Sequence, residues 1–116
     1  MSDINKLIES IIKYRNARDW KQFHNPKDSS IALSLEASEV LQHFLWQSKE
    51  EMGEYVKKHK SEIADELSDV LYWTLLMSHD LNIDILKAFD KKMKENRKKY
   101  PVNKAKGKHY KYTEYK

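Results

Sequence analysis

The sequence predicts an all-α protein with a four-helix-bundle-like fold, because few turn residues stand among many strong helix formers. Its 116 residues include two glycines and two prolines, while Lys, Glu, Leu and Ala are abundant. A chain of this length forms one domain with a single core, and we expect residues 1–116 to be that domain. The sequence has no cysteine, which excludes disulfide scaffolds, cysteine zinc sites and thiol nucleophiles.

Four main helices are predicted along the chain. The first covers residues 3–18, where apolar side chains recur at helical spacing between charged ones. A loop is predicted over 18–27, because Pro26 disfavours helix at the residue before it. Asp28 or Ser29 is then expected to cap the second helix.

The second helix is predicted to run to about Gln47, and a short extra helix follows over about 49–59. A third main helix covers about 61–81 and ends at a turn. The fourth main helix ends near Tyr100, because Pro101 cannot continue it.

Charge is distributed unevenly within a net charge of +4. From Lys87 to the end there are twelve Lys and Arg against three Asp and Glu, whereas residues 1–86 carry ten against fifteen. We expect an extended basic tail over about 101–116. Such a tail can solubilise the chain or touch nucleic acid, so a helical nucleic-acid- or partner-binding module is the alternative to an enzyme.

The beginning of the chain is polar and lacks the apolar core of a signal peptide. No uncharged apolar run approaches the roughly 20 residues that span a bilayer. We therefore expect a cytoplasmic protein with no membrane partner.

The second and third helices carry almost no charge except carboxylates. Between residues 29 and 47 the only charged side chains are Glu36 and Glu39. Between residues 63 and 79 every charge is negative, at Asp65, Glu66 and Asp69. Helices with so little charge are mostly buried, either in the monomer or in a subunit interface.

Helical spacing places these carboxylates in pairs, because residues i and i+3 are neighbours on one face, as are Glu36 with Glu39 and Glu66 with Asp69. Neither pair has a Lys or Arg three or four residues away. Four carboxylates at a partly buried site repel one another, and burial raises their pKa values, so they stay ionised only around a cation. Oxygen ligands of this kind select Mg²⁺, with Mn²⁺ as a substitute, over zinc or copper.

A di-iron site would be a different use of a carboxylate bundle. Such sites take a Glu-x-x-His pair from each of two helices. Here His43 follows Glu39 by four residues, and Glu66 has no histidine until His79. Because neither carboxylate pair is part of a Glu-x-x-His motif, a di-iron site is excluded.

Further motifs accompany the carboxylates along nearly the whole chain. They are Arg18-Asp19-Trp20-x-Gln22-Phe23-His24-x-Pro26, Leu35-Glu36-Ala37-Ser38-Glu39, Phe44-Leu45-Trp46, Asp65-Glu66-Leu67-Ser68-Asp69-Val70-Leu71 and Asn96-Arg97-Lys98-Lys99-Tyr100-Pro101-Val102. Together they resemble the MazG-like nucleotide pyrophosphohydrolases of the all-α NTP pyrophosphatase superfamily, most closely the dCTP-pyrophosphatase-like branch.

This resemblance implies the MazG fold and hydrolysis of a (deoxy)nucleoside triphosphate to the monophosphate and pyrophosphate. The dCTP-like branch favours deoxycytidine or modified nucleotides, in a nucleotide-pool house-cleaning role. Glu36, Glu39, Glu66 and Asp69 fall on the family's metal-ligand and catalytic positions. Many relatives have a glutamate where this chain has Leu35, so a carboxylate that could act as general base is absent there.

Aromatic and basic residues complete the expected substrate site. Trp20 stands between charged neighbours in a loop, which is an unusual place for a structural indole, and aromatic faces can stack on a nucleobase. The resemblance places Trp20 and Trp46 at the base pocket with His24 close by. Trp73 is either pocket wall or core, and Tyr72, an aromatic residue at helical spacing, is expected in the core. The resemblance also implies that four residues approach the triphosphate: Asn96, Arg97, Lys99 and Tyr100.

A protomer of this size leaves its carboxylate-bearing helices short of cover. We therefore expect a homo-oligomer, either a dimer or a tetramer built as a dimer of dimers, with pockets completed across the interface. The serine-rich side of residues 30–42 is a candidate contact. The expected partner is a nucleoside triphosphate, and nucleic acid is not expected.

Overall fold

The computed structural model describes residues 1–115, and every regular element within them is helical. This confirms the all-α prediction. The chain divides into two compact units, one formed by Met1–Asn82 and one that begins at Ile83.

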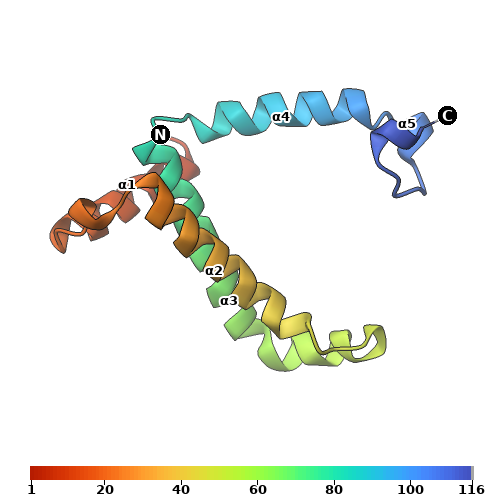
Figure 1. Ribbon diagram of the computed structural model, residues 1–116, viewed down its shortest axis with the longest axis horizontal. Helices are drawn as coiled ribbons and strands as arrows, with labels where there is room; N and C mark the ends of the chain where they lie inside the picture. Colours follow the sequence, from red (N-terminus) through yellow and green to blue (C-terminus); the bar gives the residue numbers. More distant parts are fainter. Residues whose placement is uncertain (116) are drawn as a thin grey trace. The chain divides into compact units, whose positions relative to one another are not determined.

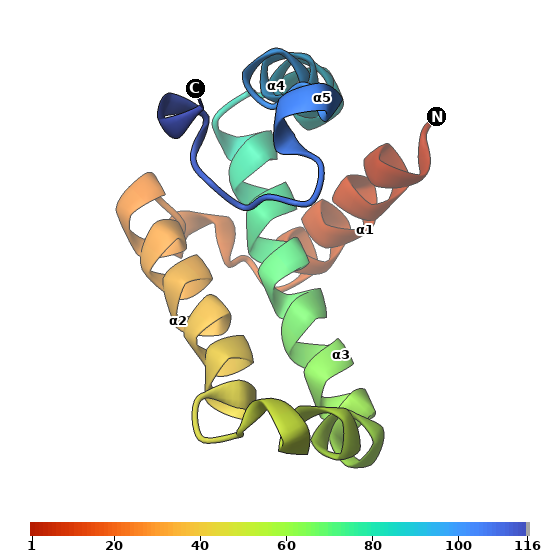
Figure 2. The same ribbon diagram turned by 90° about the vertical axis from the view of Figure 1, so that its right-hand side faces the viewer.

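The first unit contains three α-helices and a 3₁₀ turn: α1 (Asp3–Ala17), η1 (Lys21–Phe23), α2 (Pro26–Phe44) and α3 (Lys49–Asp80). Figures 1 and 2 both show α2 and α3 lying side by side in opposite directions. Helix α1 packs against the part of α3 that follows the carboxylates, where Tyr14 meets Tyr72 edge to face. The predicted carboxylate helices are therefore neighbours in space.

Side-chain caps explain where the helices begin. At the start of each main helix, the side chain of the N-cap residue accepts a hydrogen bond from a backbone N–H of the first turn. The N-cap residues are Ser2, Asn25, Ser48 and Asp84. The prediction that Asp28 or Ser29 caps α2 is wrong, because Asn25 does so. Pro26 occupies the first helical position, where its fixed φ suits the helix and its missing N–H leaves no bond unmade.

Helix α3 joins the short extra helix and the third main helix of the sequence prediction. The backbone leaves helical geometry at His59 (φ −119°, ψ 18°), close to the predicted boundary. The His59 ring stacks on Tyr55 with centroids 4.0 Å apart, and its Nδ1 lies 3.0 Å from the Tyr55 carbonyl oxygen. A kink thus takes the place of the expected break.

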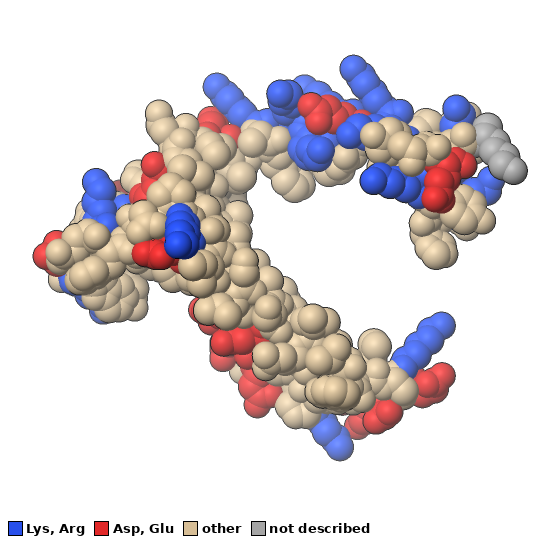
Figure 3. Space-filling model, viewed as in Figure 1, with Lys and Arg blue, Asp and Glu red and all other residues tan. Residues whose placement is uncertain are grey.

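The second unit contains two helices and a 3₁₀ turn: α4 (Ile85–Lys99), α5 (Val102–Ala105) and η2 (Tyr112–Glu114). Residues 101–115 were expected to be extended, but they include α5 and η2. Tyr100 holds this segment, since its ring packs edge to face on Tyr112 and Tyr115, at 5.8 Å in each case. The predicted basic character is evident in the Lys and Arg side chains gathered over α4 in Figure 3.

Burial within one chain is limited. Leu75 and Leu76 of α3 form the apolar centre of the first unit. By contrast, four apolar side chains of α2 and its C-terminal cap are between 48% and 60% exposed: Ile31, Leu35, Leu41 and Leu45. The burial expected for α2 is therefore not reached within the monomer. None of the helices in residues 1–115 is long and apolar enough to cross a membrane.

Serine hydroxyls cover the rest of this exposed face of α2. Those of Ser30, Ser34 and Ser38 donate to the carbonyl oxygens of Lys27, Ser30 and Ser34, at 2.8, 2.9 and 2.9 Å. These hydroxyls are thus bonded to the backbone of their own helix.

Candidate metal and nucleotide site

Three of the four predicted ligands come together between α2 and α3. One carboxylate oxygen from each of Glu36, Glu39 and Asp69 lies within 4.8 Å of the other two. Glu36 and Glu39 are one turn apart on α2, and Asp69 meets them from α3. Figure 3 shows acidic side chains gathered on one side of this helix pair.

Glu36 carries the clearest electrostatic signal of this group. Burial raises the pKa of its carboxyl, and the contact with Glu39 and the charges of Glu39, Asp69 and Glu66 raise it further. Its Oε2 is buried and has no hydrogen-bond partner within residues 1–115. A buried carboxylate oxygen without a donor, beside two more carboxylates, fits a hard divalent cation such as Mg²⁺, which binds oxygen ligands.

Glu66 faces a different partner. Its Oε2 contacts His43 Nε2, and His43 Nδ1 lies 2.8 Å from the hydroxyl oxygen of Tyr55. Because a carboxylate oxygen accepts, His43 donates to Glu66 from Nε2. The structure therefore does not group Glu66 with the three other carboxylates, although its charge still acts on Glu36.

A cavity of about 680 Å³ opens beside Asp69. Most of its lining is aromatic: Tyr14, Trp20, Phe23, His24, Tyr72 and Trp73. Successive rings meet edge to face, with centroid distances of 5.7 Å for Tyr14–Trp20, 6.3 Å for Tyr14–Tyr72, 5.3 Å for Tyr72–Trp73 and 5.4 Å for His24–Trp73. The cavity thus brings Trp20, His24 and Trp73 together with Asp69.

The loop after α1 places Trp20 by a tight reversal. Asp19 adopts a left-handed backbone (φ 53°), which Asp tolerates better than most residues. Gln22 Nε2 donates to both the carbonyl oxygen and Oδ2 of Asp19, at 3.0 Å each. The Trp20 N–H then returns to the Arg15 carbonyl oxygen at 3.2 Å. These bonds show how the Asp-Trp-x-Gln motif forms the tight turn that positions Trp20.

Within the first unit, one further predicted site residue, Trp46, does not line this cavity. Trp46 follows the end of α2 and is 85% exposed. The residues expected near the phosphates belong to the second unit: Asn96, Arg97, Lys99 and Tyr100. Within that unit, the Lys99 ammonium lies 5.0 Å from the Tyr112 ring centroid. Contact of these residues with phosphate stays a prediction.

Sequence reasoning missed two residues of this region. Tyr72 was assigned to the core but lines the cavity, and burial raises the pKa of its hydroxyl. Arg15 received no role, yet it is 1% exposed and lies 2.7 Å from Asp80 Oδ2. The burial of Arg15 could have been expected, because Arg15 follows Ile12 by three residues and therefore lies on the apolar side of α1.

Comparison with known proteins assigns the chain to a family. It is 36% identical to dCTP pyrophosphatase 1 of Rattus norvegicus and 34% identical to that of Homo sapiens, over 98% of this chain and 66% of each relative. It thus spans just under two thirds of these relatives' length. The crystal structure of a pyrophosphatase from Archaeoglobus fulgidus superposes with a TM-score of 0.82 at 30% identity, covering 87% of this chain and 94% of that one. The sequence model of the MazG-like family matches residues 31–115, and the chain therefore belongs to the MazG-like family.

Proposed function

We propose that this protein hydrolyses a nucleoside triphosphate to the monophosphate and pyrophosphate, with Mg²⁺ held by Glu36, Glu39 and Asp69 and with Glu66 as a further ligand. The observation that carries the proposal is the position of Asp69, which belongs to the carboxylate group and also lines the aromatic cavity. A triphosphate at the carboxylates and a base in the cavity would therefore be neighbours. Relatives named dCTP pyrophosphatase and pyrophosphatase support the same activity.

Each part of the site has a task in this proposal. Bound magnesium supplies charge neutralisation for the phosphates and polarises the attacking water, and Mn²⁺ can substitute for it. The rings of Trp20 and Trp73 stack on the base, for about 1–3 kcal/mol per stacked base. Leu35 is 60% exposed and offers no proton acceptor, so it supplies no general base.

The proposed substrates are deoxycytidine triphosphates or their modified forms, in a house-cleaning role in the cytoplasm. The names of the rat and human relatives support deoxycytidine. Lys99 and the neighbouring Asn96, Arg97 and Tyr100 are proposed to approach the triphosphate.

We also propose that the protein acts as a homo-oligomer, a dimer or a tetramer. Four apolar side chains of α2 are about half exposed, and no Lys or Arg lies between residues 29 and 47. An uncharged apolar stripe of this kind fits a second copy of the chain. Trp46, at the end of the same helix, would then complete the pocket of the partner copy.

A panel of canonical and modified nucleoside triphosphates, assayed for pyrophosphate release with and without Mg²⁺, tests the activity. We expect release from at least one deoxynucleotide, dependence on Mg²⁺, and loss of activity in Glu39→Gln and Asp69→Asn. Glu62→Gln, an exposed carboxylate of α3 outside the group, should leave the rate unchanged. Failure to hydrolyse any nucleotide would overturn the proposal.

The same variants separate an enzyme from a binding module. Salt-sensitive binding of DNA or RNA that survives both Glu39→Gln and chelation of divalent ions would favour the binding module.

A further inference from the structure

Arg15 is a buried cation that contacts His24, one of the residues that line the aromatic cavity. Arg15 Nη1 donates to Asp80 Oδ2 at 2.7 Å and faces His24 Nδ1 at 3.4 Å. The Arg15 side chain is 1% exposed, and that of Asp80 is 27% exposed. A buried guanidinium is stable only when it is paired, so the interaction ties α1, the loop and the end of α3 together.

The contact with Arg15 decides which nitrogen of His24 carries the proton. A guanidinium has only donors and does not lose its charge in proteins. His24 Nδ1 must therefore present its lone pair to Arg15, and the proton of the neutral ring sits on Nε2.

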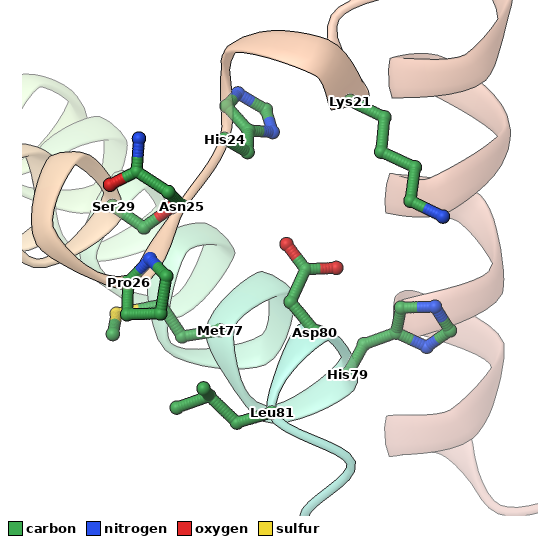
Figure 4. A pocket seen from close by; sticks show the side chains of 9 residues that line it. All are labelled: Lys21, His24, Asn25, Pro26, Ser29, Met77, His79, Asp80 and Leu81. Atoms are coloured by element: carbon green, nitrogen blue, oxygen red, sulfur yellow. The ribbon is translucent and has the colours of Figure 1, made fainter.

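Other groups around His24 agree with a neutral ring. Burial lowers the pKa of His24, the charge of Arg15 lowers it further, and Asp80 acts in the opposite direction. Lys21 and His79 line a second cavity, of about 320 Å³, together with His24 and Asp80. Figure 4 shows the Asp80 carboxylate directed toward the loop that carries His24.

His24 also reaches the aromatic cavity, whose lining it shares with Asp69, and its ring meets Trp73 edge to face. No hydrogen bond within residues 1–115 engages its Nε2. We propose that Arg15 and Asp80 are positioning residues that fix His24 in its Nε2–H form, and that His24 donates this N–H to an acceptor atom of the nucleobase, a carbonyl oxygen or a ring nitrogen. The identity of this ligand rests on the proposed function.

Nitrogen-15 NMR of the histidine ring, recorded on the nucleotide-free protein, tests the positioning directly. We expect a neutral Nε2–H signature for His24 near pH 7, assigned by its loss in His24→Gln. Arg15→Met removes the donor and leaves Asp80 facing the ring, so the His24 pKa should rise and the ring should no longer be confined to the Nε2–H form. Lys21→Met removes another cation, one that lines the second cavity, and should leave the signature unchanged. A neutral Nδ1–H form or a protonated ring in the wild type would overturn the proposal. This outcome is read from the wild-type protein alone, so it does not depend on a variant that misfolds.

Two substitutions of His24 test the donation to the base. The amide of Gln reaches about as far as Nε2, whereas that of Asn reaches about as far as Nδ1, and both amides can donate. We expect His24→Asn to raise KM for dCTP by roughly tenfold with kcat little changed, and His24→Gln to stay within about threefold of the wild type. Equal KM values for both variants would overturn the donation.

The two proposals fail in distinguishable ways. If the wild type hydrolyses no nucleotide, the proposed function fails and the donation to a base fails with it, while the NMR signature still decides the positioning by Arg15. If hydrolysis is intact but the signature is that of Nδ1–H, only the present inference fails.

Discussion

Glu36 has an unfavourable electrostatic environment that a cation would relieve. Because its pKa is raised in the folded state, its ionisation above the ordinary value of 4.5 lowers the stability of the metal-free protein. We expect metal-free Glu36→Gln to unfold at a higher temperature than the wild type at neutral pH. We also expect Mg²⁺ to raise the unfolding temperature of Glu36→Gln less than that of the wild type, because the variant has lost one metal ligand. Thermal unfolding with and without Mg²⁺ measures both effects.

Asp65→Asn is the matched control for Glu36→Gln. Asp65 is an exposed carboxylate of α3 that lies outside the group of three. Its replacement should leave the stabilisation by Mg²⁺ at the wild-type value. Equal stabilisation of Glu36→Gln and the wild type would contradict the metal site.

Trp20 is expected to contribute binding energy through stacking on the base. Its replacement by Ala should raise KM for the nucleotide by roughly 5- to 150-fold, because a stacked base is worth about 1–3 kcal/mol and about 1.4 kcal/mol corresponds to tenfold. Steady-state kinetics measures this change. Met52→Ala, in the first turns of α3, should leave KM unchanged. An unchanged KM in Trp20→Ala would contradict the stacking of the base on Trp20.

Residues of this site differ in how far sequence could predict them. Trp20 and Asp69 line one cavity, and the sequence singled out both residues because each lies in a local and unusual motif. The pairing of Arg15 with Asp80 joins positions 65 residues apart, and that of His43 with Glu66 joins positions 23 apart. Spacing along one helix cannot show such pairs, because they depend on how two helices meet.

Helix α3 begins with a capping box whose strength depends on pH. The Glu51 side chain accepts from the Ser48 N–H at 3.2 Å, and its own N–H donates to the Ser48 hydroxyl oxygen at 3.3 Å. The hydrogen bonds with the side chain and backbone of Ser48 hold the pKa of Glu51 below its ordinary value of 4.5. The contribution of Glu51 to stability is therefore fully present above that value and is lost as the pH falls from it through the lower pKa of the folded state.

This predicts a steeper acid loss of stability in the wild type than in Glu51→Gln. Gln can still accept the Ser48 N–H but does not titrate, so its unfolding temperature should fall less between about pH 6 and about pH 3. Thermal unfolding across this range measures the difference. Glu50→Gln, in the same turn, should follow the wild type, and parallel curves for all three proteins would contradict the prediction.

At the scale of elements, the sequence predicted the order and approximate length of the helices, because their apolar periodicity is long and regular. It did not predict that α2 begins at Pro26, where Asn25 is the cap. It also did not predict the continuity of α3 through His59. The stacking of His59 on Tyr55 accompanies a kink there, and the periodicity of two shorter helices cannot distinguish a kink from a loop.

At the scale of the whole molecule, the exposed face of α2 predicts self-association. Leu41→Glu places a charge on this face and should convert the oligomer to a monomer, as measured by light scattering after size-exclusion chromatography. Leu7→Glu, a half-exposed leucine of α1, should leave the oligomer intact. A wild-type protein that is monomeric throughout the concentration range would contradict the prediction.

The serine hydroxyls of α2 bear on how readily that face can be dehydrated. Those of Ser30, Ser34 and Ser38 already donate to carbonyl oxygens of their own helix. Removing water from them therefore leaves no donor unpaired, which avoids the main penalty for burying a polar group. Their small size also permits a second helix to approach closely. These serines can thus be hydrated in a single chain and lose their water on association without changing their hydrogen-bond partners.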